Sequence, residues 1–463
     1  MNILLINPPI REWAKPNCFP VGLGYVAAVL RDAGHHVKVL DINANRYSRE
    51  EVEEIIKTSM FEIVGVGGMI TIYKYIKWLV SVLKKYHPNK YIIVGGSVSS
   101  SIPEILLENT ETDIACIGEG ENTIVDLIAA LDSKKDISSV RGIYYKRNRQ
   151  IFKTLPQTLL NMEDLPLPAY DLFPMEIYLN NIVGILNKKK WQGGDVSDAS
   201  QIISFNISAS RGCPYNCIFC YHDFMGTKYR CQSPEKVINH MKFLIEKYRV
   251  NYFLIQDDLF MANLKNFTEF CEKLIKEELN VQWQVPGRVN LITEELLLLM
   301  KKAGCIWCGF GFESGSQYML DRMKKGTTVE QAKRAALLVK KHFGRTGGGS
   351  FVLGLPGESL RTIQDTIDFC KQLDFDPEVV FLATPYPGTE LWDIASQKNM
   401  IRDKEAYILS LDEQGEQIVC NFTDFTNDEL LMLRSYVIRS IGARNIDIHE
   451  NHNKNGGDIK NKI

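Results

Sequence analysis

The sequence predicts an α/β protein in which a doubly wound parallel sheet precedes an open, partial barrel and a helical C-terminal region. Three observations lead to this prediction. Short apolar runs alternate with amphipathic stretches from Met1 to about Leu131. A second alternating series begins at Ile203, without the turn pattern of the first. From about Glu390 the pattern becomes helical and less regular.

The first series predicts a five-stranded sheet over residues 1–135. Alternation of strand and helix implies right-handed βαβ units and a parallel sheet that is covered on both faces. The expected strands are Ile3–Asn7, Val37–Asp41, Ile63–Gly67, Tyr91–Gly95 and Ile114–Gly118. The expected helices are Gly22–Ala33, Arg49–Ser59, Tyr73–Tyr86, Ile102–Glu108 and Asn122–Leu131. Five strands is the number of the flavodoxin-like doubly wound fold.

The exits of these strands are rich in glycine, proline and asparagine. They read Asn7-Pro8-Pro9, Asp41-Ile42-Asn43, Gly67-Gly68, Gly95-Gly96-Ser97 and Gly118-Glu119-Gly120-Glu121. All five exits share the carboxyl edge of the sheet, where ligands of open α/β folds bind. Glycine there lets a bulky ligand approach the backbone closely. Tight turns are the alternative explanation, but glycine at three of the five exits favours a ligand edge.

Residues 136–200 form a predicted linker. The prolines of Glu163–Pro168 break helices and favour extended chain. The basic and polar stretch Lys188–Ser200 is interpreted as a solvated loop rather than a nucleic-acid site, because it is short and lacks supporting basic helices.

The second series predicts a partial (β/α)6 TIM-like barrel over residues 201–390. Its expected strands are Ile203–Ser208, Tyr252–Asp257, Val281–Val285, Cys308–Glu313, Ser350–Gly354 and Val379–Thr384. Its expected helices are Pro234–Tyr248, Lys265–Glu278, Glu294–Ala303, Val329–Phe343 and Leu360–Leu373. In such barrels the chemistry lies at the C-terminal ends of the strands. A helical region at 391–450 and a polar, disordered tail at 451–463 are expected to follow.

The composition is that of a soluble globular protein. The 463 residues carry a net charge of −2, with 45% hydrophobic and 24% charged residues, which predicts no binding to nucleic acid or anionic membranes. No window approaches the ~20 apolar residues of a membrane span. The first residues enter an apolar strand without a basic leader, so they do not indicate a signal peptide. Eleven cysteines, an odd number thinly spread, indicate a reducing, cytoplasmic compartment.

Three of these cysteines lie within eight residues. Cys213, Cys217 and Cys220 have the spacing C-x3-C-x2-C, which can hold three irons of a [4Fe–4S] cluster and leave the fourth iron open. An open metal position indicates a catalytic site. Structural zinc is the alternative, but the nearby candidates for a fourth ligand, His222 and Cys231, do not have a finger spacing.

The other cysteines are expected to be structural. Cys305 and Cys308 form a C-x2-C at the entry of a strand, on the opposite barrel face from the cluster. Cys271 and Cys370 fall within helices. All four are interpreted as small buried apolar side chains.

The cysteine cluster resembles that of the radical S-adenosylmethionine (SAM) superfamily, whose hallmark is C-x3-C-x2-C with an aromatic residue, here Phe219, before the last cysteine. The resemblance continues at the ends of the expected strands, in Asp257-Asp258, Arg288, Gly311-Phe312-Glu313-Ser314-Gly315, Gly354-Leu355-Pro356-Gly357-Glu358 and Pro385-Tyr386-Pro387-Gly388-Thr389. It implies that S-adenosyl-L-methionine binds the open iron and is cleaved with an electron from an external donor such as flavodoxin or ferredoxin.

The resemblance also implies a set of SAM-binding residues. They are Phe219, Asp257, Asp258, Arg288, Glu313, Ser314 and Gly354. The two aspartates match the position that meets the methionine amino group, and Arg288 the position that meets its carboxylate, as the charges of SAM require. Taken singly, Glu313 could instead cap a helix and Arg288 could be a surface residue.

The N-terminal domain resembles the cobalamin-binding domain that precedes many radical SAM cores. The implied cobalamin-binding residues are Asn7, Pro8, Gly67, Gly68, Gly95, Gly96, Ser97, Gly118, Glu119, Gly120 and Glu121. The axial histidine of D-x-H-x-x-G is missing from this chain, and His35 and His36 precede the second strand, at the wrong edge. A vestigial domain that no longer binds cobalamin is the alternative.

These features predict an oxygen-sensitive radical SAM enzyme, specifically a cobalamin-dependent methyltransferase that acts on an unactivated carbon of a small-molecule or peptide intermediate. Tyr386 is expected to help shape the substrate pocket. The alternative is an oxidative cyclase or rearrangement enzyme, like the anaerobic magnesium-protoporphyrin cyclase that the chain also resembles. A methylthiotransferase is disfavoured, because that class has three further cluster cysteines and only Cys18 and Cys116 precede the linker. A non-enzymatic cobalamin sensor leaves the clustered cysteines unexplained.

Overall fold

The computed structural model describes residues 1–12, 16, 18–179, 202–222, 228–343, 348–373, 379–411 and 417–442. The predicted polar loop at 188–200 and tail at 451–463 lie outside the described residues. The chain divides into two compact units, which are treated separately below. The first unit comprises Met1–Pro286, Leu298–Trp307 and Pro385–Glu413. The second unit comprises Gly287–Leu297, Cys308–Thr384 and Gln414–Ile463.

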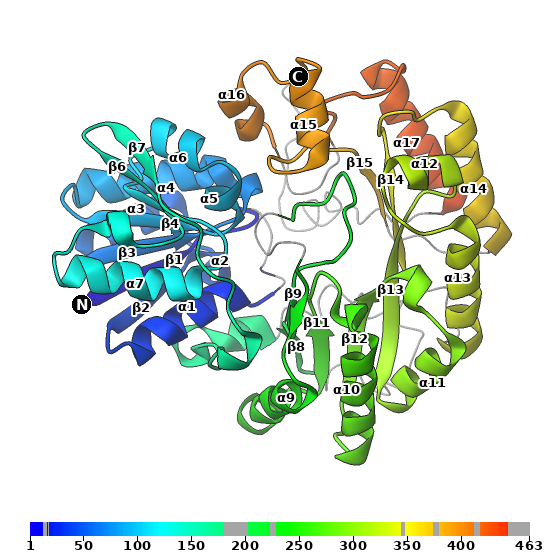
Figure 1. The fold of residues 1–463 in the computed structure, drawn as a ribbon, viewed down its shortest axis with the longest axis horizontal. Helices are drawn as coiled ribbons and strands as arrows, with labels where there is room; N and C mark the ends of the chain where they lie inside the picture. Colours follow the sequence, from blue (N-terminus) through cyan, green and yellow to red (C-terminus); the bar gives the residue numbers. More distant parts are fainter. Residues whose placement is uncertain are drawn as a thin grey trace, which may run out of the picture. The chain divides into compact units, whose positions relative to one another are not determined.

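The N-terminal sheet, sheet A, confirms the doubly wound prediction. Its parallel strands are β1 (Asn2–Asn7), β2 (His36–Asp41), β3 (Ile63–Gly67), β4 (Tyr91–Gly95) and β5 (Ile114–Cys116). Their order in space is β2-β1-β3-β4-β5, which is the flavodoxin-like order. The carboxyl ends of these strands therefore share one edge, as the sequence predicts (Figure 1).

A β-hairpin extends sheet A to seven strands, so the prediction of five strands is wrong. Strands β6 (Ile143–Arg147) and β7 (Gln150–Lys153) pair antiparallel to each other, and β6 pairs antiparallel to β5. Asn148 and Arg149 both have positive φ, 52° and 64°, as a tight two-residue hairpin turn requires. The predicted linker at 136–200 thus begins within the sheet. The hairpin is short, and only its alternating pattern of Ile, Tyr and Phe signals it.

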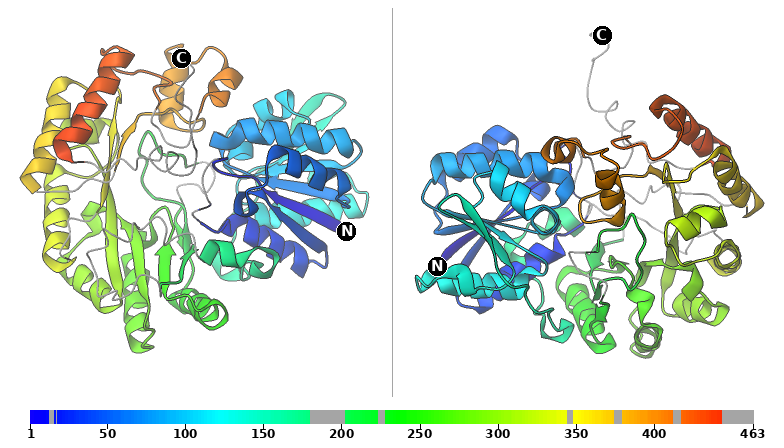
Figure 2. Two further views of the ribbon diagram at one scale, coloured as in Figure 1. Left: turned by 180° about the vertical axis from the view of Figure 1, so that it is seen from behind. Right: turned by 45° about the horizontal axis from the view of Figure 1, so that its top comes forward.

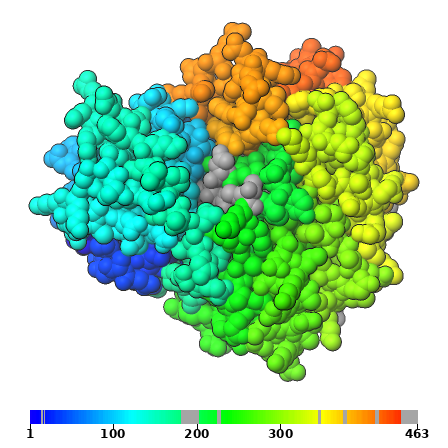
Figure 3. Space-filling view, in the orientation of Figure 1, coloured from blue at the N-terminus to red at the C-terminus, as the bar shows by residue number. Residues whose placement is uncertain are grey.

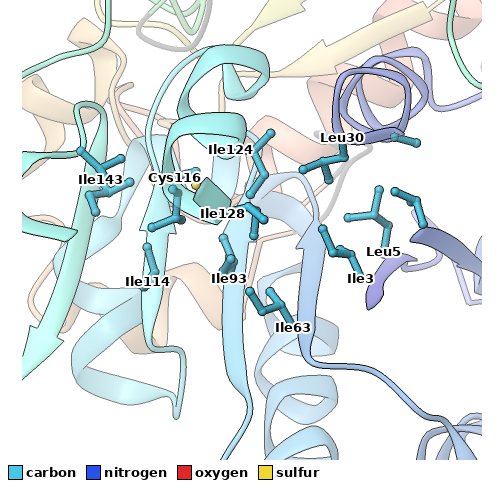
Figure 4. Packing of buried hydrophobic residues seen from close by; sticks show 14 of the residues in the cluster. Ile3, Leu5, Leu30, Ile63, Ile93, Ile114, Cys116, Ile124, Ile128 and Ile143 are labelled. Atoms are coloured by element: carbon cyan, nitrogen blue, oxygen red, sulfur yellow. The ribbon is translucent and has the colours of Figure 1, made fainter. Parts of the chain in front are cut away.

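Helices cover both faces of sheet A (Figures 1 and 2). Helices α1 (Val21–Asp32) and α7 (Gly120–Asp132) pack on one face, over a core that Figure 4 shows. Strand residues Ile3, Leu5, Ile63, Ile93 and Ile114 meet Leu30, Ile124 and Ile128 of these helices in that core. Helices α3 (Arg49–Thr58) and α4 (Tyr73–Tyr86) cover the other face, where alternate strand residues point. Short helices α2 (Ile42–Asn45), α5 (Ser97–Ser101) and α6 (Pro103–Asn109) complete the domain.

The second series of strands confirms the six βα repeats. Its strands are β8 (Ser204–Ile207), β11 (Tyr252–Ile255), β12 (Gln282–Gly287), β13 (Cys305–Glu313), β14 (Gly349–Leu353) and β15 (Val379–Leu382). They are neighbours in that order in one sheet, which is the topology of a partial barrel. Its helices are α9 (Pro234–Tyr248), α10 (Leu264–Lys276), α11 (Glu294–Lys302), α12 (Gln317–Arg322), α13 (Val329–Phe343) and α14 (Leu360–Leu373).

One small hairpin in the first unit was not predicted. Strand β9 (Ser210–Arg211) pairs antiparallel with β10 (Arg230–Cys231), on either side of the cysteine cluster. Strands of two residues are too short to produce a periodic pattern in the sequence.

The predicted C-terminal helical region is shared between the two units. Helices α15 (Glu390–Gln397) and α16 (Lys404–Leu409) belong to the first unit, where Glu405 accepts hydrogen bonds from Tyr73 (2.8 Å) and Lys77 (2.6 Å) of α4. Figures 1 and 3 show this segment in orange beside the blue N-terminal domain. Helix α17 (Asn427–Ile441) belongs to the second unit and packs on α14 and β15. No helix in the described part of the chain is long and apolar enough to cross a membrane.

Candidate cofactor sites

The three clustered cysteines lie on a loop that directly follows β9. Cys217 is buried, whereas Cys213 and Cys220 are partly exposed. The Cys220 amide donates to the Cys217 carbonyl (3.1 Å), which closes the last turn of the loop around the half-buried Phe219. The Leu391 amide of α15 donates to the Ile218 carbonyl (2.8 Å). Helix α15 therefore stabilises the cysteine loop through a backbone hydrogen bond.

The donors on this loop fit an iron–sulfur cluster better than a single metal ion. Each thiolate of a [4Fe–4S] cluster binds a different iron, whereas zinc needs its ligands around one ion. Among the described residues, no three His, Cys, Asp or Glu side chains are placed to hold one ion. Cys231, a candidate zinc ligand, accepts a hydrogen bond from Tyr229 in the β9/β10 hairpin, and burial raises the pKa of its thiol.

Asp257 holds the start of the cysteine loop. It follows β11 and is buried, and its carboxylate accepts hydrogen bonds from the Ala209 amide (3.0 Å) and the Ser210 hydroxyl (2.8 Å). Burial raises the pKa of Asp257 to about 7, although these hydrogen bonds oppose the shift. Since both carboxylate oxygens bind the loop, Asp257 is better suited to positioning the cysteines than to meeting the amino group of SAM.

Asp258 is the better placed of the two aspartates to meet a ligand. Its side chain is exposed, and its carboxylate accepts the amide of Gly212, the residue before Cys213. Desolvation raises the pKa of Asp258, whereas nearby His222 and the Gly212 amide lower it. An acidic group beside the cluster loop can pair with the amino group of an amino-acid ligand.

The remaining cysteines confirm their structural interpretation. Cys271, Cys305, Cys308 and Cys370 are all buried. Burial raises the pKa values of the Cys308 and Cys370 thiols to about 12. Such thiols stay protonated and are poor metal ligands.

The carboxyl edge of sheet A combines an open glycine exit with a closed polar cluster. The predicted residues Asn7, Gly67, Gly68, Gly95, Gly96, Ser97, Gly118 and Gly120 are half-buried there, and Pro8, Glu119 and Glu121 are buried. A Cβ built on Gly95 would meet nothing within 4 Å, which leaves room for a ligand against the backbone. Gly96 has φ +88°, and a Cβ there would lie 2.4 Å from the Gly68 carbonyl oxygen, so this position requires glycine.

Asn7 belongs to the polar cluster. Its amide nitrogen donates to Asp41 (2.8 Å) and to the Tyr178 hydroxyl (3.2 Å), and that hydroxyl donates to Asp41 (2.6 Å). Burial raises the pKa of Asp41, against the effect of these hydrogen bonds. Asn7 thus fixes the chain at the edge of sheet A. Tyr178 binds both Asn7 and Asp41, and no local sequence pattern predicts this contact.

The described histidines of the N-terminal domain lie away from this edge. In residues 18–179, His35 and His36 lie at the amino end of β2, and His87 ends α4 and bonds the Ile56 carbonyl (2.7 Å). The described part of the N-terminal domain therefore offers no histidine there as an axial ligand.

Glu119 and Glu121 are both engaged in buried ion pairs, and their role as ligand-binding residues stays a prediction. Glu121 accepts a two-bond contact from Arg211 of β9, with the shorter bond at 2.5 Å, and Glu119 accepts a matching contact from Arg230 of β10 (2.6 and 3.0 Å). All four side chains are buried or nearly so. Burial alone would raise the pKa of Glu119, but the hydrogen bond from Arg230 and the charge of Arg211 lower it.

In the second unit, Glu313 is engaged in a buried ion pair. It ends β13 with φ +66° and binds Lys325 Nζ (2.8 Å). A Cβ on Gly311 would lie 2.2 Å from the Glu313 carboxylate, so only glycine leaves space for this pair. The N-cap of α12 is Ser316, so Glu313 does not cap that helix, and its predicted contact with SAM would have to share the carboxylate with Lys325.

The other predicted residues of the second unit are also buried. Arg288 is 6% exposed, so it is not a surface residue, and its guanidinium lies against Gly326. The Ser314 hydroxyl hydrogen-bonds Thr366 of α14 (3.1 Å). Gly354 follows β14, and its amide donates to Glu358, whose pKa burial raises to about 7.

Tyr386 lies in the first unit, at the start of its C-terminal segment. The side chain is half-buried, and its carbonyl accepts the Thr389 hydroxyl (2.7 Å) in the turn before α15. These contacts position the turn, and the role of Tyr386 in a substrate pocket stays a prediction.

Comparison with protein families gives two matches in consecutive parts of the chain. Residues 10–128 match the B12 binding domain, and residues 207–370 match the radical SAM superfamily. The first match covers sheet A through α7, and the second starts at the end of β8, before the cysteine loop.

Similar proteins carry both parts. The chain is 31% identical over 408 residues to an uncharacterized methyltransferase of Pyrococcus horikoshii, covering 87% of this chain and 84% of that protein. It is 30% identical to the anaerobic magnesium-protoporphyrin IX monomethyl ester cyclase of Rubrivivax gelatinosus, covering 88% and 72%. The fold resembles the radical SAM methyltransferase TsrM of Kitasatospora setae, with a TM-score of 0.70, 19% identity and coverage of 86% and 77%.

Proposed function

The chain belongs to the radical SAM superfamily, among the members that carry a B12-binding domain, and from this premise we propose that it is a cobalamin-dependent methyltransferase. The acceptor would be an unactivated carbon of a small-molecule or peptide intermediate. One observation carries the proposal: a single compact unit contains both the C-x3-C-x2-C loop and the glycine edge that is open at Gly95.

When bound, the iron–sulfur cluster supplies the electron that cleaves SAM, and cobalamin supplies a carrier for the methyl group. Cys213, Cys217 and Cys220 would hold the cluster. Asp258 would bind the amino group of SAM, and Arg288 would bind its carboxylate through a guanidinium fork. Each of these residues orients its ligand, and none needs to move a proton.

The glycine exits of β3, β4 and β5 would hold cobalamin. Gly67, Gly95 and Gly118 present backbone instead of side chains to a wide, flat ligand. The short helix α5 offers the Ser97 hydroxyl, which accepts the Ile70 amide (3.3 Å) and can still donate to a ligand.

The names of three relatives support the proposal. The Pyrococcus protein is described as a methyltransferase, as are a cytidylyl-2-hydroxyethylphosphonate methyltransferase of Streptomyces wedmorensis (26% identity) and a hopanoid C-3 methylase of Methylococcus capsulatus (25% identity). These acceptors differ widely, so they support the reaction class and not a particular substrate.

The electron would come from a small carrier such as flavodoxin or ferredoxin.

The test of this proposal needs no substrate. The chain is reconstituted anaerobically with iron and sulfide, and absorbance is recorded with and without cobalamin. SAM and reduced cobalamin are then added, and S-adenosylhomocysteine is measured. A methyltransferase releases S-adenosylhomocysteine only when cobalamin is present. If cobalamin neither co-purifies with the protein nor changes its spectrum, the methyltransferase proposal fails.

The similarity to the anaerobic cyclase supports a second candidate, an oxidative cyclase or rearrangement enzyme. Such an enzyme would form 5′-deoxyadenosine with cluster and reductant but transfer no methyl group. Metabolites that accumulate on deletion of the gene distinguish the two candidates. A precursor that lacks one methyl group favours the methyltransferase, and an unclosed ring favours the cyclase.

A further inference from the structure

We propose that Arg211 and Glu121 are positioning residues that fix the glycine edge of sheet A to the loop that carries the cluster cysteines. The inference rests on the proposed function, because it concerns the placement of two cofactors. It assigns a role to the buried ion-pair network of Arg211, Arg230, Glu119 and Glu121, which is called the strut below.

The strut connects two segments that each adjoin a candidate cofactor site. Arg211 lies two residues before Cys213, and Glu121 lies three residues after Gly118. Arg211 Nη2 is 2.5 Å from one Glu121 oxygen, and Arg211 Nη1 is 3.3 Å from the other. Arg211 Nη1 also lies 3.2 Å from Glu119. Arg211 thus binds both Glu119, the N-cap residue of α7, and Glu121 in the first turn of that helix.

Burial and charge favour a single geometry for the strut. The side chains of Arg211 and Glu121 are 5% and 4% exposed, so water does not compete for their hydrogen bonds. Two arginines face two glutamates, which leaves no net charge in the buried space. A guanidinium and a carboxylate joined by two parallel bonds are fixed in angle as well as distance. The Tyr25 ring, 5.6 Å from the Arg211 guanidinium, closes the remaining side.

Both ends of the strut are attached to rigid backbone. On the cluster side, Ala209 binds Gln232 (2.9 Å) and Asp257 (3.0 Å), directly before β9. On the cobalamin side, the Gly118 amide donates to the Ser100 hydroxyl (2.8 Å). Arg230 also donates to the Leu160 carbonyl (2.8 Å). Leu160 belongs to the predicted linker at 136–200, so the linker is bound to the strut as well. The strut therefore joins two segments that are each held by further hydrogen bonds.

Stability alone does not account for the strut. Buried ion pairs are often no more stabilising than apolar side chains of the same volume, but they fix one geometry. Radical transfer depends on geometry, since a misplacement of 1 Å can slow a reaction about 100-fold. The exposed pair of Arg31 and Asp171 (2.9 Å) also joins the N-terminal domain to the predicted linker, and it provides a matched control because it is open to solvent.

The test uses the holoenzyme, reconstituted with cluster and cobalamin. The variants are Glu121→Gln and the double substitution Arg211→Met/Glu121→Leu, which keeps the buried charges balanced and protects the fold. Asp171→Asn is the control. Pulsed electron paramagnetic resonance measures the distance distribution between the reduced cluster and cob(II)alamin. We expect a narrow distribution for the wild type and the control, and a broad or shifted one for both strut variants.

Product analysis gives a second readout that a purely structural role would not change. In the strut variants, the ratio of 5′-deoxyadenosine to S-adenosylhomocysteine should change by about tenfold, with cluster content and 5′-deoxyadenosine formation within about twofold of wild type. The proposal is overturned if both variants keep the wild-type distance distribution, or if both products fall in parallel with the cluster content.

Failure of the proposed function would be recognised separately. If the wild type binds both cofactors but transfers no methyl group, the methyltransferase proposal fails. The distance measurement still tests whether the strut positions the two cofactors. If it binds no cobalamin, hydrogen exchange of the cluster-loaded protein decides instead. Glu121→Gln should then speed exchange at both residues 117–121 and residues 208–213. Faster exchange at residues 117–121 alone would overturn the proposal.

Discussion

The exits of two groups of parallel strands differ in what they leave available for a ligand. In sheet A, the exit of β4 is bare backbone, and a side chain built on Gly95 would extend into open space. In the second series, the exits of β11 and β13 carry the carboxylates of Asp257 and Glu313, and both are already bonded to protein groups. The exit of β4 thus offers space, whereas Asp257 and Glu313 hold the chain around them.

The difference shows that an acidic residue after a strand is weak evidence for a ligand contact. A buried carboxylate needs partners, and the protein supplies them when it can. Asp257 takes amide and hydroxyl groups of the cysteine loop, and Glu313 takes Lys325. A glycine with open space in front of it has no such need. Its openness is therefore the more direct sign of a ligand site.

The largest effect is expected for the cysteine loop. Replacing Cys213, Cys217 and Cys220 together with alanine should abolish cluster binding and all SAM cleavage, because no other three cysteines of the sequence lie within eight residues of one another. Iron and sulfide content and 5′-deoxyadenosine formation measure this. Cys271→Ala, in a buried helix, is the control and should keep both. Full function in the triple variant would instead support a non-enzymatic cobalamin sensor.

The second largest effect tests whether Glu313 is a structural residue. Glu313→Gln leaves Lys325 charged and buried without its counterion, which should lower the free energy of unfolding by about 3–5 kcal/mol. Urea unfolding, monitored by hydrogen exchange in the second unit, measures the loss of stability. The exposed pair of Glu330 and Lys333 is the control, and Glu330→Gln should change stability by less than about 0.5 kcal/mol. Unchanged stability with weaker SAM binding would restore Glu313 as a ligand residue.

The third effect is a pH dependence that arises from Asp257. Its pKa of about 7 in the folded chain lies above its ordinary value of 3.8, so the folded chain holds the proton more tightly than the unfolded chain. This contribution to stability is complete at low pH and is lost as the pH rises towards 7. Between pH 5.5 and 7 the loss should be about 2 kcal/mol, at most about 1.4 kcal/mol per pH unit.

The substitution Asp257→Asn should remove that slope, because the amide does not titrate. Urea unfolding of the cluster-free chain at several pH values measures the slope, and wild-type and variant curves should converge as the pH falls. Asp171→Asn, at an exposed pair, should leave the slope unchanged. Parallel curves for wild type and Asp257→Asn would show that Asp257 is ionised throughout.

The smallest effect concerns the open glycine of sheet A. Gly95→Ala should leave the free energy of unfolding within about 0.5 kcal/mol, since the new methyl group meets no protein atom. It should weaken cobalamin binding about tenfold, or about 1.4 kcal/mol, because the methyl group occupies ligand space. Absorbance titration with cobalamin measures the affinity. The neighbouring Gly96→Ala should do the reverse and destabilise the fold, because its Cβ would clash with the Gly68 carbonyl. Equal affinity for wild type and Gly95→Ala would place cobalamin elsewhere.

The sequence predicts the elements well wherever a periodic pattern is long. The strands β3 and β4 and the helices α4, α9, α13 and α14 begin and end at the predicted residues. The pattern fails for short elements, such as the β6/β7 hairpin and the two-residue strands β9 and β10. An alternation of apolar and polar residues over two to five positions does not stand out from the loops around it, whereas the continuous apolar runs of β3 and β4 do.

The sequence by itself determined the cysteine loop, the glycine exits and the order of the βα repeats, because these depend on spacing along the chain. Only the tertiary structure decided which polar groups are free to meet a ligand. Glu121 and Arg211 are 90 positions apart, and no local pattern connects them. Buried charges choose partners by proximity in space, and the fold sets that proximity. Glu119 and Glu121, beside the glycine exits, form ion pairs with Arg230 and Arg211. Gly95 has open space in front of its backbone.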